Sequence, residues 1–306
     1  MENYPIFSII ITTYNRANLV HRAILSVLEQ SYGNFELIII NGGSTDSTDQ
    51  VVRSIYDKRI RYIIQNENKG LHSSRNLGSE IAIGKYLYFL DDDDELIPGA
   101  LEQIIQSIDN LSSNDVKWFW FNAVYAETNS FSGTGFHNEE KKVLFRDLLC
   151  QKIRGDYALV LNREAFGTNG SDERLWGYEG LLLLKIHKEY DGYYFPKVIL
   201  RKYRQHGARI SNISILPHLS QLILGESLYL EDFGDEMKTI CPHTYARHLF
   251  NLGYFQMLDG KKEEAKKNIL LSLKSRFSLK VFIFYILSIF LPHQQLIFLC
   301  KILKKV

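Results

Sequence analysis

Cysteine is scarce in this sequence, with three residues among 306. Cys150, Cys241 and Cys300 are far apart along the chain, so we expect neither a disulfide framework nor a zinc site built on cysteine pairs. So few thiols fit a reducing compartment, where disulfides do not persist.

Signal-peptide and membrane-spanning patterns are also missing. The first residues include no basic region, and the apolar run Ile6–Ile11 is too short for the core of a signal peptide. No segment reaches the roughly 18–20 apolar residues that a membrane-spanning helix needs, and the nearest one, Val281–Leu291, is interrupted by Pro292. We therefore predict a cytoplasmic protein.

A large net charge is absent too. The 36 Lys and Arg residues balance 35 Asp and Glu residues to a formal charge of +1, so nothing draws the whole chain to nucleic acid. The balance is uneven, because residues 261–306 carry a net charge of +8 and the remainder carries −7. Apolar residues make up 45% and charged residues 23%, as in ordinary globular proteins. At this length we expect one large domain with an appendage.

Strand and helix patterns alternate in the N-terminal third of the chain. This alternation predicts βαβ units and a mainly parallel sheet, with strands at Ile6–Ile11, Glu36–Ile40, Arg61–Gln65 and Tyr86–Leu90. We expect the intervening helices to be capped by Asn18, by Asp46 or Ser47, and by Ser73 or Ser74. Ligands of such sheets bind beyond the carboxyl ends of the strands. Function should therefore lie in the loops Thr12–Arg16, Asn41–Asp46, Asn66–Gly70 and Asp91–Glu95.

Further along, strands become rarer and helices take over. We predict strands at Lys117–Ala126, Tyr157–Leu161 and Tyr193–Tyr203, and a linker from Ser211 to about His218. The helices that follow are predicted at Leu219–Leu230, Tyr245–Leu258 and Lys261–Leu273, before an apolar tail.

Five consecutive acidic residues, Asp91–Glu95, follow the fourth predicted strand. Neighbouring carboxylates are costly to keep ionised without a counter-charge. A divalent cation supplies such a charge, and Mg²⁺ typically binds one or two carboxylates together with substrate phosphates. The alternative is a solvated acidic loop before the helix that follows Pro98, where negative charge is favourable.

The four loops together resemble glycosyltransferase family 2. Its members share a Thr-Tyr-Asn-Arg start, an Asp-Asp-Gly-Ser-Thr-Asp turn, an Ala-Arg-Asn-x-Gly segment and a Leu-Asp-x-Asp-Asp loop. This chain has Thr13–Arg16, Asn41–Asp46, Ser74–Gly78 and Leu90–Asp94 in the same order. The resemblance implies an α/β fold of the GT-A (Rossmann-like) type, a mainly parallel sheet flanked by helices. It would span residues 1–210, with a nucleotide-sugar-binding half (1–110), an acceptor half (111–210) and a C-terminal helical extension (211–306).

The resemblance also implies roles for single residues. Asp91 and Asp93 would be the DXD pair that holds Mg²⁺ or Mn²⁺, with Asp93 counted among the catalytic residues. The residues expected to bind the nucleotide sugar are Thr13, Tyr14, Asn15, Asn41, Arg75, Asp91 and Asp92. Asn41 stands where the family has an acid, so the nucleotide preference is open, with uridine diphosphate the first expectation.

The acceptor half departs from the family pattern. The family's general base is the Asp of a Glu-Asp pair, and this chain has Glu179-Gly180 instead. Glu179 could serve as the base, Asp172 could replace it, or the chain could transfer poorly or not at all. Glu179 could also simply cap the helix that follows. His206, within Tyr203-Arg204-Gln205-His206, is expected to complete the metal site or to bind the diphosphate.

Trp118 and Trp120 share one face of a strand, where core packing is expected and a sugar-stacking platform is the alternative.

Residues 274–306 are apolar with basic flanks, which suits a helix in the interface of an anionic bilayer. The tail is apolar nearly all round, so a buried helix or a dimer contact stays open.

The prediction is therefore a metal-dependent, inverting glycosyltransferase. It would move a sugar from a nucleotide-sugar donor to a saccharide or lipid-linked saccharide in bacterial surface polysaccharide synthesis. We expect the protein in the cytoplasm, peripheral to the inner face of the plasma membrane. We expect no nucleic-acid partner, and a homo-oligomer is one possible assembly. One alternative is a nucleotide-sugar-binding partner subunit that has lost transfer. A nucleotidyltransferase is a weaker one, because Thr12–Arg16 is not a Gly-rich triphosphate loop.

Overall fold

The computed structural model describes residues 4–111, 115–136, 138–167, 170–203, 215–291 and 295. The chain forms two compact units. The first comprises residues 1–148, 152–173 and 182–205, and the second comprises residues 149–151, 174–181 and 206–306.

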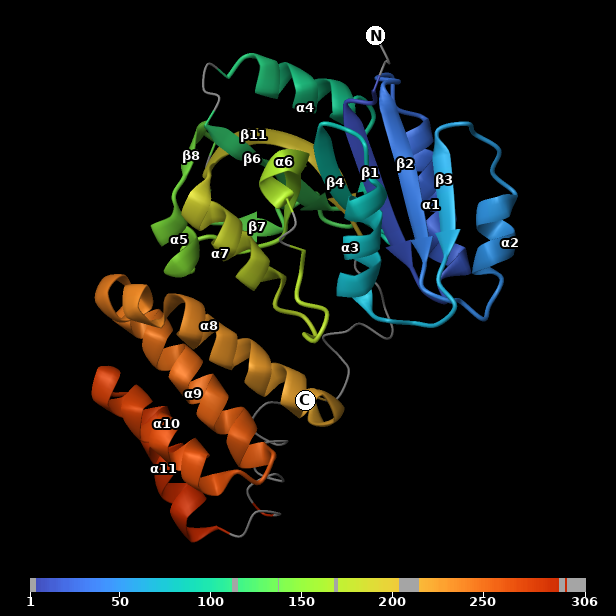
Figure 1. Ribbon diagram of the computed structural model, residues 1–306. Coiled ribbons are helices and arrows are strands. Elements are labelled where there is room, and N and C mark those ends of the chain that lie inside the picture. Colours follow the sequence, from blue (N-terminus) through green and yellow to red (C-terminus); the bar gives the residue numbers. More distant parts are fainter. Residues whose placement is uncertain are drawn as a thin grey trace. The chain divides into compact units, whose positions relative to one another are not determined.

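A nine-stranded sheet is the centre of the first unit (Figure 1). Its strands run in the order β3-β2-β1-β4-β10-β6-β11-β5, and β8 pairs with β11. The strands are β1 (Phe7–Thr13), β2 (Phe35–Asn41), β3 (Ile60–Ile64), β4 (Tyr86–Asp91), β5 (Glu95–Leu96), β6 (Val116–Tyr125), β8 (Lys141–Val143), β10 (Tyr157–Asn162) and β11 (Asp191–Lys202). Two short strands, β7 (Gly133–Thr134) and β9 (Arg154–Gly155), pair with each other.

The first four strands are parallel, as the sequence predicts. Strands β1 and β2 are almost wholly buried, which suits their continuous apolar sequences. Register places Thr13 beside Asn41 and Thr12 beside Asp91. Strand β11 is parallel to β6, and both run in the direction of β4 because β10 lies antiparallel between β4 and β6. The carboxyl ends of β1, β2, β4 and β11 therefore lie at one edge of the sheet.

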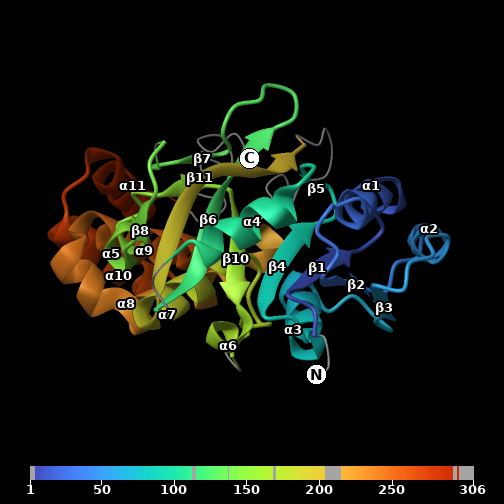
Figure 2. The same ribbon diagram turned by 90° about the horizontal axis from the view of Figure 1, so that it is seen from above.

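Helices cover both faces of this sheet, and Figure 2 shows α4 on one side and α6 on the other. One core joins the sheet to α1 (Ala17–Leu28), α2 (Thr48–Arg53) and α4 (Ala100–Asp109). The other joins it to α3 (Leu71–Ile81), α6 (Arg163–Phe166) and α7 (Glu179–Glu189), with α5 (Phe145–Leu149) at its margin. Two predicted helix starts were wrong: α1 begins after Arg16 rather than Asn18, and α3 begins after Gly70, with neither residue making a side-chain cap.

Trp118 and Trp120 belong to the second of these cores. Each is only 4% exposed, and the Trp120 indole N–H donates to His187 Nε2 over 3.3 Å. The Trp118 ring stacks on the same imidazole. The core-packing interpretation is confirmed, and no sugar platform lies here.

Four helices form the body of the second unit, side by side in Figure 1. They are α8 (Leu219–Ile240), α9 (Pro242–Leu258), α10 (Lys262–Ser275) and α11 (Leu279–Phe290), after a 3-10 turn at Leu216–His218. Helix α9 packs against α8 and α10, and α10 packs against α11. Helix α8 runs further than predicted because Phe233 and Met237 continue its buried face. Within the described residues, no helix is long and apolar enough to cross a membrane.

The expectation about cysteine was wrong for two of the three residues. Cys150 and Cys241 form a disulfide within the second unit, with their Cα atoms 5.3 Å apart. The two cysteines are 91 residues apart in the sequence. The expectation was wrong because separation along the sequence does not determine the distance between two side chains in the folded chain. The cysteines therefore give no support to a reducing compartment. Cys300 lies outside the described residues.

Candidate active site

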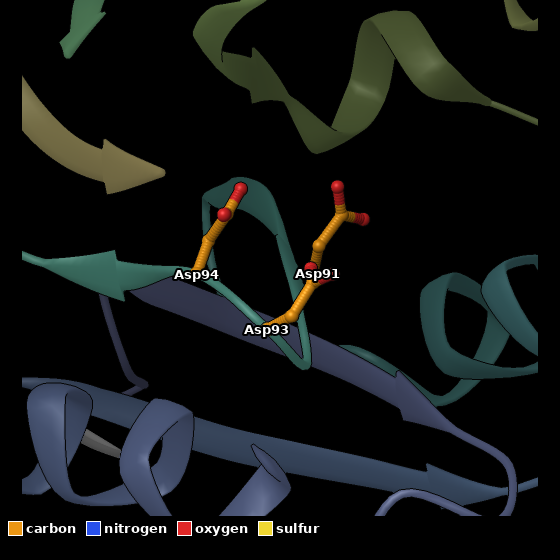
Figure 3. A group of neighbouring side chains, drawn as sticks. All are labelled: Asp91, Asp93 and Asp94. Carbon is orange, nitrogen blue, oxygen red and sulfur yellow. The ribbon is translucent and has the colours of Figure 1, made fainter. Parts of the chain in front are cut away.

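The acidic run forms the connection between β4 and β5. Asp91 is the last residue of β4, and its backbone carbonyl accepts a hydrogen bond from the Asp94 N–H, which closes a tight turn. Each of Asp91, Asp93 and Asp94 offers a carboxylate oxygen within 4.8 Å of the others. Figure 3 shows Asp91 and Asp94 pointing to the same side of this turn. The sequence thus brings three carboxylates together at the carboxyl edge of the sheet.

Basic side chains surround these acids. Arg16 Nη1 lies 3.1 Å from both Asp92 Oδ1 and Asp93 Oδ2, and Arg75 Nη2 lies 2.9 Å from Asp91 Oδ1. The protein therefore supplies much of the counter-charge that the sequence analysis assigned to a metal. The crowding of acids alone does not require a cation.

Lys202, at the end of β11, adds a further positive charge. Its Nζ lies 2.7 Å from Asp94 Oδ2 and 3.9 Å from Asp91 Oδ2, and its side chain is 17% exposed. Burial lowers the pKa of Lys202, but the neighbouring carboxylates outweigh burial and raise it. The ammonium group therefore stays charged and ties β11 to the acidic turn.

The acids of the turn differ in exposure. The side chains of Asp92 and Asp94 are 8% and 3% exposed, whereas those of Asp91 and Asp93 are 44% and 23% exposed. Burial raises the pKa of Asp92 to about 6 and that of Asp94 to about 7. For Asp91, burial acts in the same direction, but Arg75 and Lys202 outweigh it and lower the pKa. Asp91 and Asp93 are thus the more accessible oxygen donors, a type that suits Mg²⁺ or Mn²⁺.

Hydrogen bonds join the loops after β1 and β2. Asn15 has a left-handed backbone with φ of 53°, and its side-chain oxygen accepts from the Thr45 N–H over 2.7 Å. The Asn15 N–H donates to Ser44 Oγ over 2.9 Å. The Gly42 N–H donates to the Thr13 carbonyl over 2.9 Å. Two loops that are distant in sequence therefore form one continuous surface.

Asn41 lies beneath this surface. It is 1% exposed, its Nδ2 donates to the Tyr62 hydroxyl over 2.8 Å, and its Oδ1 accepts from the Ser44 N–H over 2.8 Å. The amide thus holds the turn after β2 in shape. Thr13 is also buried, whereas Tyr14 is 42% exposed and presents its ring to solvent.

Asn76 holds the backbone at Ser171 through two hydrogen bonds. Its side-chain amide donates to the Ser171 carbonyl over 2.8 Å and accepts from the Ser171 N–H over 2.9 Å. Asp172, which the sequence offers as an alternative to Glu179 for the base, is the next residue along the chain. A polar groove of about 470 Å³ borders Asn76, lined by Ile63–Glu67, Lys69, Ser73, Asn76, Leu77, Glu80 and Glu173.

Glu179 belongs to the second unit, where it is the exposed first residue of α7. Two left-handed residues precede it, Gly177 with φ of 76° and Tyr178 with φ of 67°. This conformation is uncommon for a bulky residue such as tyrosine. The Tyr178 hydroxyl donates to the Leu222 carbonyl over 3.1 Å and contacts Glu226 Oε1 over 3.2 Å. These contacts hold the strained backbone that presents Glu179.

Tyr229 accounts for the glycine at position 180. A Cβ atom built on Gly180 would lie 2.7 Å from the Tyr229 hydroxyl oxygen. The Tyr229 ring is 8% exposed and stacks on His248, whose Nδ1 lies 2.6 Å from Glu226 Oε2. The room for an acid at position 180 is thus taken by a tyrosine hydroxyl. His206, predicted as a metal ligand, lies outside the described residues.

The chain matches the profile of Glycosyl transferase family 2 over residues 8–162. It belongs to glycosyltransferase family 2. A Campylobacter jejuni relative, GalNAc(5)-diNAcBac-PP-undecaprenol beta-1,3-glucosyltransferase, is 29% identical, and the match covers 97% of each chain. An uncharacterised glycosyltransferase of Haemophilus influenzae is 42% identical over 33% of this chain and 41% of its own length.

Solved structures agree on the fold of this glycosyltransferase. Staphylococcus aureus TarS 1-349 in complex with UDP-GlcNAc has a TM-score of 0.65 at 16% identity, covering 92% of this chain and 86% of that one. The mannosyltransferase PcManGT from Pyrobaculum calidifontis, in complex with GDP-Man and Mn²⁺, has a TM-score of 0.56 at 16% identity, with coverage of 95% and 83%. The GT-A architecture predicted from the sequence is confirmed, with its C-terminal helical region.

Sequence reasoning missed two residues of this glycosyltransferase. Lys202 has a signal in the sequence, because it is a basic residue near the end of the predicted strand Tyr193–Tyr203, and the carboxyl ends of strands are where ligands of such sheets bind. Tyr229 carries no signal in the sequence. It lies on the buried face of a long helix, 49 positions beyond Gly180, and only the fold brings the two together.

Proposed function

We propose that this glycosyltransferase moves a sugar from a UDP-linked donor to a lipid-linked saccharide in the assembly of a bacterial surface polysaccharide. The observation that carries the proposal is the alignment of Asp91, Arg75 and the loops after β1 and β2 at one edge of the sheet. The acceptor class is supported by the name of the Campylobacter relative, which matches over nearly the whole chain.

Donor binding is assigned to the first 110 residues. The exposed Tyr14 ring stacks on the base, while Thr13, Asn15 and Asn41 shape the surface beneath it. Arg75 turns its guanidinium from Asp91 toward the diphosphate, whose paired oxygens suit that planar group. Asp92 holds Arg16 in the loop after β1.

A divalent cation fits the exposed oxygen donors of this edge. Asp91 and Asp93 would hold Mg²⁺ or Mn²⁺, which when bound supplies positive charge against the departing nucleoside diphosphate. Asp94 is engaged by Lys202 and by the Tyr203 N–H, so we assign it to fixing the turn.

Residues 111–210 are assigned to acceptor binding, and Glu179 is assigned as the general base. The Glu179 carboxylate takes the proton from the acceptor hydroxyl. The hydroxyl oxygen attacks the anomeric carbon of the donor sugar as the nucleoside diphosphate leaves from the opposite face. Configuration is therefore inverted. The exposed position of Glu179 and the strained backbone before it support this role. The reaction takes place at the inner face of the plasma membrane.

Donor hydrolysis with a panel of nucleotide sugars tests the proposal. A UDP-sugar should be turned over in the presence of Mn²⁺, and Asp93→Asn should reduce turnover by at least about 10²-fold, the scale for loss of one preorganised electrostatic group. Asp235→Asn, on the exposed surface of α8, is the matched control and should leave the rate unchanged. Full metal-dependent activity in Asp93→Asn would contradict the assignment of the DXD pair.

Gly180 favours a second candidate, a binding subunit without transfer activity. Isothermal titration with UDP and Mn²⁺ separates the two. Binding of UDP without turnover of any donor would support the second candidate, whereas turnover of one donor would exclude it.

A further inference from the structure

Exposed apolar side chains are concentrated at the C-terminal end of the second unit. Among the described residues, fifteen large apolar side chains are exposed, and eight of them fall between Leu270 and Phe290. They are Leu270, Leu271, Phe277, Leu279, Phe282, Ile283, Ile289 and Phe290. We call this set the apolar patch. Isolated exposed apolar residues are normal on a protein surface, but a concentration of this kind marks an interaction site.

Helix α11 has two apolar faces, and only one is covered. Val281, Phe284 and Tyr285 pack into the cluster formed with α9 and α10. On the opposite face, Phe282 is 41% and Phe290 is 77% exposed. These positions recur at helical spacing, so they form a stripe along the helix. Packing within the unit therefore accounts for one face of α11. On the other face, Phe282 contacts the ring of Phe277, another exposed member of the patch, with 6.0 Å between ring centroids.

The surroundings of the patch are basic. Lys267, Lys274, Arg276 and Lys280 are all exposed, and Lys274, Arg276 and Lys280 lie between apolar members of the patch. The sequence contains no acidic residue after Glu264. Long basic side chains can lay their carbon stems along an apolar surface and extend their charges outward. The patch therefore combines exposed apolar groups with a single sign of charge.

We infer that the apolar patch docks on the surface of an anionic phospholipid bilayer, with α11 lying in the interface plane. The apolar stripe enters the acyl boundary, and the lysine and arginine side chains meet anionic headgroups. A second copy of this chain fits less well, because a symmetric dimer would bring each basic cluster against its own copy. The inference rests on the proposed function in one respect, that a lipid-linked acceptor lies in such a bilayer.

Vesicle sedimentation with the full chain tests the inference. Wild-type protein should sediment with phosphatidylcholine vesicles that contain phosphatidylglycerol, and much less with phosphatidylcholine alone. The triple variant Phe282→Ser, Ile283→Ser, Phe290→Ser should bind at least about tenfold more weakly, because apolar contact supplies part of the affinity. The variant Lys274→Gln, Arg276→Gln, Lys280→Gln should lose the preference for phosphatidylglycerol and the dependence on salt.

A matched control replaces exposed apolar residues elsewhere. Tyr56→Ser with Phe131→Ser removes two side chains that are 95% and 53% exposed, and it should bind vesicles as the wild type does. Thermal melting checks that each variant is folded. Donor hydrolysis without vesicles reports the active site separately. A serine triple variant that no longer binds vesicles but still hydrolyses the donor supports the inference. A wild-type protein that binds vesicles but hydrolyses no donor supports the inference and contradicts the proposed function.

Two results would overturn the inference. One is vesicle binding by the folded serine triple variant at the wild-type level. The other is a wild-type dimer in solution that the serine triple variant converts to monomer, without binding of the wild type to phosphatidylglycerol vesicles. That second result would assign the patch to another copy of the chain.

Discussion

Single residues fix the backbone that positions Glu179, the proposed general base. Tyr178 adopts a left-handed backbone and is fixed through its hydroxyl to Leu222 and Glu226. Such strain is retained in a fold only where the surrounding contacts enforce it, and it is concentrated at functional sites. The position of the Glu179 carboxylate is thus set by contacts within its own unit.

Replacement of this acid tests its role directly. Glu179→Gln should lower kcat by about 10²–10⁴-fold, the usual contribution of a general base, with little change in donor affinity. Steady-state kinetics and titration with UDP provide the two measurements. Asp172→Asn is the companion variant and should keep most of its activity. A large loss in Asp172→Asn together with a wild-type rate in Glu179→Gln would move the base to Asp172.

Gly180 offers a prediction about stability. Gly180→Ala should lower the free energy of unfolding by about 1–3 kcal/mol, because the new methyl group meets the Tyr229 hydroxyl in a packed site. Adding Tyr229→Phe removes the obstructing oxygen and should recover part of the loss. Urea unfolding gives the values, and Gly33→Ala, where a Cβ meets nothing within 4 Å, is the control. Independent, additive effects of the two changes would refute the steric account.

At the scale of elements, the four parallel strands could be predicted because their apolar runs reflect burial on both faces of a sheet. The starts of α1 and α3 could not, because Arg16 and Gly70 make no side-chain cap that a pattern would reveal. The loops that follow each strand can be read from the strand pattern, so the sequence predicts where the acidic turn lies. The sequence does not predict the counter-charges of this turn, since Lys202 reaches Asp94 through the pairing of strands that are distant in the chain.

The contact between α7 and β6 carries a pH dependence. Burial lowers the pKa of His187 from 6.5 to about 4, although Asp191 acts in the opposite direction. As the pH falls from about 6.5 to about 4, the unfolded chain binds a proton at this side chain and the folded chain does not. Stability from this group is therefore lost with falling pH, by at most about 3 kcal/mol.

His187→Gln should remove that dependence while retaining an acceptor for the Trp120 indole. Urea unfolding of both proteins between pH 4.5 and 7 measures it, and the difference between the two curves should shrink as the pH falls. Parallel curves across this range would show that His187 is not the titrating group.

At the scale of the whole molecule, the disulfide cross-links the second unit. Cys150 and Cys241 close a loop with a sequence separation of 91 residues, and a cross-link over such a loop typically stabilises by about 2–4 kcal/mol. Reductant should therefore lower the melting temperature of the wild type but not that of the Cys150→Ser, Cys241→Ser variant. Thiol titration of the denatured protein should find one thiol before reduction and three after it. Three thiols before reduction would contradict the cross-link.

The joined loops after β1 and β2 have a consequence for the kinetics of the proposed donor binding. Asn15 joins the two loops by hydrogen bonds in the folded chain, so we expect little loop disorder to be lost in the proposed binding of a nucleotide. We expect a preorganised surface of this kind to discriminate between uridine and guanosine diphosphates chiefly through how long each one stays bound.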